Sequence, residues 1–129
     1  MTLHITALVA ALLTLWAVAL SNYVSITRGR LGVQNGDGGN PAMALAVRRH
    51  ANLMENLPLS LGMLGLAELS GLATGWMVAL GTALVLARLV HPFGLSQTVI
   101  NSPLRIGPTV INHLVNVTCA LFILWTNLA

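Results

Sequence analysis

The sequence contains very few charged residues. It has no lysine, three acidic residues and six arginines, so charged residues occupy 7% of its 129 positions. A soluble domain needs about 25% charged residues to cover its surface. Because 56% of the residues are hydrophobic, the composition excludes a water-soluble enzyme, a disordered tail and a nucleic-acid-binding domain.

Cysteine is almost absent as well. The single residue of this type, Cys119, excludes a disulfide framework or a cysteine metal site within one chain. No group of histidine, cysteine and aspartate has the spacing of metal ligands. We therefore expect no metal site, and we expect Cys119 to serve as packing in an apolar stretch.

Long apolar stretches dominate the chain instead. A membrane-spanning helix needs about 20 residues, so residues 1–129 form a single domain with room for four spans. Residues 17–19 resemble a signal-peptide cleavage site, but the nearest positive charges follow this stretch rather than precede it. We predict an all-α integral membrane four-helix bundle, with a retained first helix and spans over about residues 3–26, 41–69, 75–91 and 106–128.

Glycine and proline mark the predicted helix limits. Residues 29–41 are rich in glycine and have the composition of a loop. Asn40 is expected to be the N-cap of the second helix, with Pro41 at its first position. Pro58 is expected to bend that helix, and Pro92 is expected to end the third one.

The arginines predict the orientation in the membrane. If the N-terminus lies outside, all six fall on or near the cytoplasmic face, as the positive-inside rule requires. Both termini are then expected outside, or periplasmic, and a charged site is expected to open toward the cytoplasm. The arginines concerned are Arg28, Arg30, Arg48, Arg49, Arg88 and Arg105.

A polar cluster lies within the predicted second helix. Arg48, Asn52 and Glu55 are spaced so that they share one face of the helix. A carboxylate inside the membrane boundary is costly unless it is paired. Its candidate partners are Arg48 and Arg88, and we expect a structural ion pair between Glu55 and Arg88.

More positively charged side chains are expected near the membrane depth of Glu55 than one ion pair requires. This surplus favours a pocket for an anionic ligand with carboxylates, which arginine binds in a bidentate manner. The alternative is a structural network whose arginines reach lipid phosphates. The residues that join the cluster from other helices are Arg28, Arg30, Arg88, His91 and Arg105.

Three segments resemble one known family. Residues 48–58, with the sequence RRHANLMENLP, are similar to the second-helix signature of the MAPEG family, the membrane-associated proteins in eicosanoid and glutathione metabolism. Residues 88–91 and 104–107 resemble the end of the third helix and the start of the fourth in bacterial-type members. The resemblance implies a homotrimer of four-helix bundles that binds glutathione as co-substrate between neighbouring subunits.

The resemblance also implies the role of each residue. Arg105 matches the arginine that holds the glutathione sulfur as a thiolate, which would attack a lipophilic small molecule dissolved in the lipid bilayer. An adjacent guanidinium favours the thiolate form of a thiol. The sequence departs from many catalytic members at Leu95, where they carry tyrosine, and at Ala51. The residues that match glutathione contacts are Arg28 or Arg30, Arg48, Asn52, Glu55 and His91.

The resemblance therefore implies a glutathione-dependent transferase or peroxidase, and two other functions stay open. One is a small four-span proton-coupled transporter that uses Glu55, although the neighbouring arginines would repel cations. The other is a non-catalytic MAPEG-like protein that binds lipid or a partner. The polar residues Asn112, His113 and Asn116 are expected to form hydrogen bonds between helices, and Glu68 is expected to be a solvated helix cap.

Overall fold

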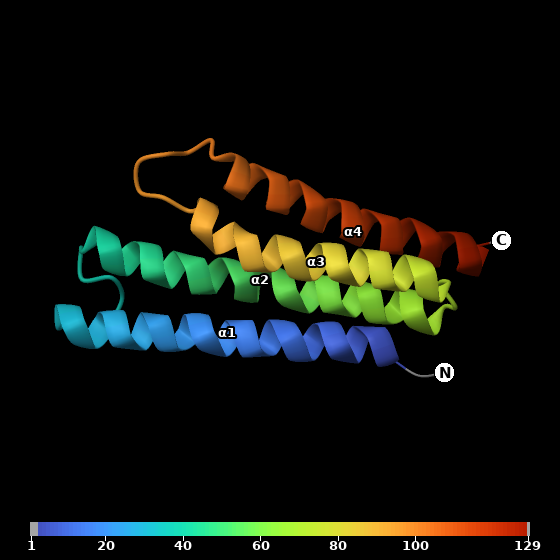
Figure 1. The fold of residues 1–129 in the computed structure, drawn as a ribbon, viewed down its shortest axis with the longest axis horizontal. Coiled ribbons are helices and arrows are strands. Elements are labelled where there is room, and N and C mark those ends of the chain that lie inside the picture. The colour runs from blue at the N-terminus through green and yellow to red at the C-terminus, as the bar shows by residue number, and fades with distance from the viewer. Residues whose placement is uncertain (1–2, 129) are drawn as a thin grey trace.

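The computed structural model describes residues 3–128, which form four long helices and no strand. The helices run alternately up and down, and both termini lie at the same end of the bundle (Figure 1). We call this the terminal end, and we call the opposite end, with the α1–α2 and α3–α4 connections, the loop end. The predicted all-α fold is confirmed. The helices are α1 (His4–Leu31), α2 (Pro41–Leu69), α3 (Thr74–Gly94) and α4 (Pro103–Leu128).

The protein is an integral membrane protein. Three helices, α1, α3 and α4, are long and apolar enough to cross a membrane. Four spans were predicted, and α2 has the required length, with 29 residues. It carries more charged side chains than any of the other three helices, and they are Arg48, Arg49, Glu55 and Glu68.

The limits of α1 and α2 follow from local chemistry. Asn40 caps α2 as predicted, because its Oδ1 accepts hydrogen bonds from the backbone N–H groups of Ala42 (2.9 Å) and Met43 (3.3 Å). The first span was predicted to end at about residue 26, and the helix that contains it continues to Leu31. Arginine is a good helix former, so the helix continues until Gly32 adopts a left-handed conformation, with φ 66°.

The third helix continues past the predicted end at residue 91. Pro92 has no N–H to donate to the carbonyl of Arg88, four residues earlier. The indole Nε1 of Trp16 on α1 donates to that carbonyl oxygen instead, at 3.2 Å. The helix therefore extends through Pro92 to Gly94, because a neighbouring helix replaces the missing hydrogen bond.

A residue of α2 caps the first helix. Leu3, the N-cap of α1, has no side chain that accepts a hydrogen bond. The carboxylate of Glu68 accepts hydrogen bonds from the backbone N–H groups of Ile5 (2.9 Å) and Thr6 (2.8 Å). The expectation of a solvated cap for Glu68 is therefore wrong, since this side chain holds the ends of α1 and α2 together.

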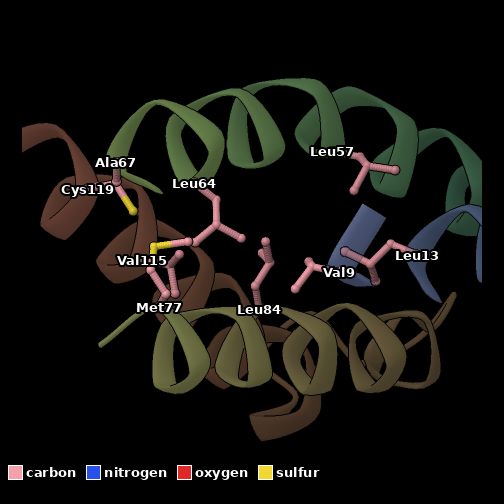
Figure 2. Close-up of a cluster of buried hydrophobic side chains, with 9 residues drawn as sticks. All are labelled: Val9, Leu13, Leu57, Leu64, Ala67, Met77, Leu84, Val115 and Cys119. Carbon is pink, nitrogen blue, oxygen red and sulfur yellow. The ribbon is translucent and has the colours of Figure 1, made fainter. Parts of the chain in front are cut away.

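The apolar core fills the middle and the terminal end of the bundle. All four helices contribute to it, and Figure 2 shows their side chains directed toward one another. Cys119 is fully buried there, in agreement with its expected place in the packing. The core residues are Val9, Leu13, Leu57, Leu64, Ala67, Met77, Leu84, Val115 and Cys119.

Candidate functional site: the arginine cluster at the loop end

The six arginines all lie in the loop-end half of the bundle. Arg28 and Arg30 occupy the last turn of α1, and Arg105 lies in the first turn of α4. Arg48 and Arg49 follow the start of α2, while Arg88 precedes the end of α3. The structure thus confirms that the arginines share one end of the bundle, as the up-and-down path in Figure 1 requires.

Arg48 and Glu55 form an ion pair on the surface of α2. Nη1 of Arg48 lies 2.9 Å from Oε1 and 3.2 Å from Oε2 of Glu55, and the two side chains are 55% and 52% exposed. The expected ion pair between Glu55 and Arg88 is therefore wrong. Two helical turns place Arg48 and Glu55 on the same outer face, whereas Arg88 points into the bundle and is only 3% exposed.

Arg88 is held by amide oxygens inside the bundle. Its Nε donates to Oδ1 of Asn112 at 2.9 Å, and its Nη1 donates to Oδ1 of Asn52 at 3.4 Å. Ser60 donates a second hydrogen bond to Oδ1 of Asn112, at 3.0 Å. Within residues 3–128 no carboxylate pairs with this guanidinium, so the network connects α2, α3 and α4 and retains a positive charge.

The polar residues of α4 divide between two roles. Asn112 forms the predicted hydrogen bonds between helices. His113 instead contacts the carbonyl oxygen of Thr109 on its own helix, at 2.7 Å. Oδ1 of Asn116 is buried and has no hydrogen-bond partner in the described chain.

A glycine brings the end of α3 against the start of α4. A Cβ atom on Gly94 would overlap the backbone of Leu104 and Arg105. Only glycine permits this backbone contact, because any side chain would force the two helices apart. Gly94 therefore fixes the position of Arg105 beside the last turn of α3.

His91 is buried near the end of α3, where it is 4% exposed and follows Arg88 by three residues on the same helix. Within residues 3–128, the guanidinium of Arg105 has one hydrogen bond, from Nη1 to the backbone carbonyl of Ile100 at 3.3 Å. Among the predicted site residues, hydrogen bonds join Arg48 to Glu55 and Arg88 to Asn52.

Arg28 and Arg30 do not join this group within one chain. Nη1 of Arg28 donates to the carbonyl oxygens of Val33 (3.2 Å) and Gly36 (3.1 Å), and so holds the loop that follows its own helix. The hollow beside Arg28 is lined by Ser25, Arg28, Gly29, Gly32, Val33 and Gln34. Arg30 is exposed, and within residues 3–128 neither arginine forms a hydrogen bond with Arg48, Asn52, Glu55 or His91.

Arg49 was predicted to lie at the cytoplasmic face but was not assigned to the site, yet it occupies a distinct position. Its Nη2 donates to the carbonyl oxygen of Leu95 at 3.3 Å, and its Nε is buried with no partner in the described chain. It lines an apolar hollow together with Trp16 and Phe93. The adjacent pair Arg48-Arg49 was the available signal, because consecutive helical residues point to different faces.

Comparison with known proteins agrees with the architecture. The MAPEG family model matches residues 6–125. Inner membrane protein YecN of Escherichia coli strain K12 is 34% identical over 91 residues, which cover 70% of this chain and 69% of YecN. The YecN protein of Escherichia coli O6:H1 strain CFT073 matches to the same extent. The chain therefore belongs to the MAPEG family.

Proposed function

We propose that the protein is a membrane-embedded glutathione-dependent transferase or peroxidase that acts on lipophilic electrophiles. The observation that carries the proposal is the surplus of positive charge at the loop end. Six arginines lie there with two carboxylates, Asp37 in the α1–α2 loop and Glu55 on α2, and the Arg48–Glu55 pair is half-exposed. A small molecule with carboxylates would supply the missing negative charge.

The exposed groups complement glutathione. At neutral pH this tripeptide carries two carboxylates and one ammonium group, so it needs both a cationic and an anionic partner. Arg48 would bind a carboxylate and Glu55 would bind the ammonium. The side-chain oxygen Oδ1 of Asn52 accepts from Arg88, which leaves the side-chain N–H groups of Asn52 to donate to the ligand.

We place the site between chains of a homotrimer. Arg48 and Glu55 are half-exposed on the surface of a single chain, so a second copy would have to supply the opposite wall. Arg28 and Arg30, which make no contact with Arg48 or Glu55 of their own chain within residues 3–128, would contribute from that neighbour. The family membership and the positive-inside rule support an inner-membrane location in which the loop end faces the cytoplasm and both termini face the periplasm.

Arg105 would stabilise the glutathione thiolate. A free thiol has a pKa near 8.5 and is mostly protonated at neutral pH. A decrease of two pKa units requires about 2.7 kcal/mol of differential stabilisation. Within residues 3–128 the guanidinium of Arg105 bonds to one backbone carbonyl and pairs with no carboxylate, so its charge would be available to the sulfur. The thiolate would then attack an electrophile that arrives through the bilayer.

The thiolate absorbance of bound glutathione tests this role. On addition of glutathione to the purified protein at pH 7, we expect an ultraviolet difference band from the thiolate. In Arg105→Ala this band should correspond to only a few per cent of the bound glutathione, the thiolate fraction of a free thiol at this pH. Arg105→Lys, which keeps the charge, should retain part of the band. Equal bands in the wild type and Arg105→Ala, with glutathione bound in both, would contradict the assigned role.

The pairing of Glu55 weakens the transport alternative. A proton-coupled transporter for lipophilic cations needs a carboxylate that is free to exchange its proton with the cargo. Glu55 is engaged by Arg48 through both of its oxygens. Proton-driven uptake of a lipophilic cation into liposomes, abolished by Glu55→Gln, would favour transport over the proposed function.

A further inference from the structure

Two hollows lie between α1 and α3, apart from the Arg48–Glu55 pair, and we call them together the groove. Their volumes are about 220 Å³ toward the loop end and about 290 Å³ toward the terminal end. The first is lined by residues of α1 from Trp16 to Tyr23 and by Pro92 and Phe93 of α3. Both helices are apolar enough to span the membrane, so the groove lies along the bilayer normal.

The two hollows differ in one chemical group. The terminal-end hollow is lined by apolar residues, one glycine and one threonine. The loop-end hollow has the guanidinium of Arg49 in its wall. Nε of Arg49 is buried without a hydrogen-bond partner, Nη2 binds only a backbone carbonyl, and no carboxylate in residues 3–128 pairs with it. This hollow therefore combines an apolar wall with an uncompensated positive charge.

The walls of the loop-end hollow suit a hydrocarbon chain. The rings of Trp16 and Phe93 lie 6.2 Å apart at an interplanar angle of 33° and form one wall, and Trp16 is held in place by its hydrogen bond to the carbonyl of Arg88. Tyr23 lies on α1 toward the loop end, where its ring suits the membrane interface. A volume of about 220 Å³ is below that of usual drug-sized pockets, about 300–1,000 Å³, and is sufficient for part of one acyl chain.

We infer that this hollow is a binding site for an anionic phospholipid. One acyl chain lies against Trp16 and Phe93, and the negatively charged headgroup pairs with Arg49. Basic pockets between membrane helices bind anionic headgroups in this way. The charge of Arg49 selects an anionic lipid over a zwitterionic one, and the position of Arg49 at the loop end selects the leaflet on that side. The inference is independent of glutathione, since the proposed glutathione contacts include none of these groups.

The test measures lipid retained by the purified full-length chain. The protein is reconstituted in nanodiscs of equal phosphatidylglycerol and phosphatidylcholine, and native mass spectrometry counts the lipids that remain after transfer to detergent. We expect one retained phosphatidylglycerol per chain in the wild type. Arg49→Gln should reduce this retention about fivefold or more, the effect of one arginine near an anionic lipid surface, whereas Arg49→Lys should keep most of it.

Two further variants separate the charge from the groove. Ala19→Trp fills the hollow from α1 without changing Arg49, and it should also abolish retention of phosphatidylglycerol. Arg30→Gln removes an exposed arginine from the same end of the bundle and should leave retention unchanged. Circular dichroism and oligomer size on a sizing column identify any variant that fails to fold. If Arg49→Gln fails to fold, the comparison of Arg49→Lys with Ala19→Trp tests the inference instead.

Several results would overturn the inference. Equal retention of the two lipids, or wild-type retention in Arg49→Gln or Ala19→Trp, would show that the hollow is not the anionic lipid site. Displacement of phosphatidylglycerol by palmitate at equal concentration would assign the hollow to a free fatty acid instead. A crosslink between a cysteine placed at position 93 and a second copy would show that another chain covers the groove.

Discussion

The two ends of the bundle use different forces to hold the same four helices together. At the terminal end and in the middle, apolar side chains from all four helices pack into one cluster. At the loop end, Arg88 is buried among the polar side chains of Asn52, Ser60 and Asn112. The apolar cluster and the Arg88 network meet on α2, where Ser60 lies between the core residues Leu57 and Leu64.

The difference between the two ends predicts what amino-acid substitutions will change at each end. A buried guanidinium without a carboxylate is costly unless amide oxygens and hydroxyl groups satisfy it. The protein retains this costly arrangement beneath the half-exposed Arg48–Glu55 pair, where a ligand is proposed to bind. We therefore expect substitutions at the terminal end to change stability alone, and substitutions at the loop end to change stability, ligand affinity or both.

The largest loss of stability is expected in the apolar cluster. Leu84 is fully buried, and Leu84→Ala should lower the free energy of unfolding in detergent by about 3 kcal/mol, because it leaves a cavity. Glutathione affinity, measured below the unfolding transition, should stay at the wild-type value. A tenfold loss of affinity in this variant would break the division between the two ends.

A somewhat smaller loss is expected in the Arg88 network. Arg88→Met removes donors from Asn112 and Asn52 and should cost about 2 kcal/mol. Because Asn112 then remains buried with only the Ser60 donor, the double variant Arg88→Met/Asn112→Leu should cost less than the sum of the single variants. Denaturant unfolding of the wild type, the two single variants and the double variant measures this coupling, and strict additivity would show that the network is not a unit.

The contact between Glu68 and α1 is expected to contribute less. Glu68→Ala removes the acceptor for two backbone N–H groups and should cost about 1 kcal/mol, the usual value of an N-cap. Glu68→Gln keeps a neutral acceptor and should lose about half as much. Hydrogen exchange of the Ile5 and Thr6 amides reports the local effect, and unchanged protection in Glu68→Ala would contradict the cap.

The smallest effect on stability is expected at the exposed ion pair. Arg48→Ala should change the free energy of unfolding by less than about 1 kcal/mol, since exposed ion pairs contribute little. The same variant should weaken glutathione binding about tenfold, because a charge-assisted bidentate contact is lost. A large loss of stability without loss of affinity would assign this pair to structure rather than to the ligand.

Local chemistry allowed much of this fold to be predicted from the sequence. Asn40 and Pro41 define the start of α2 because their signals act within one turn. The gathering of all six arginines at one end was also predicted. Successive spans alternate in direction, so the helix ends that carry arginine come to lie on the same side of the membrane. The helix count and the family also followed from patterns that lie within single segments.

The remaining features depend on contacts between helices. The continuation of α3 through Pro92 depends on Trp16, 72 residues from its acceptor Arg88. The cap of α1 depends on Glu68, more than 60 residues away. The partner of Glu55 was predicted wrongly because spacing along α2 does not reveal that Arg88 points inward. Such contacts are set by the packing of the helices and have no local signal.

Calorimetric titration of the purified protein with glutathione tests the central claim most directly. The wild type should release heat on binding. A glutathione concentration one hundred times the dissociation constant should raise the free energy of unfolding by about 2.7 kcal/mol. Arg48→Ala should bind more weakly under the same conditions. No heat and no stabilisation of the wild type at millimolar glutathione would contradict the claim that the loop-end arginines hold this ligand.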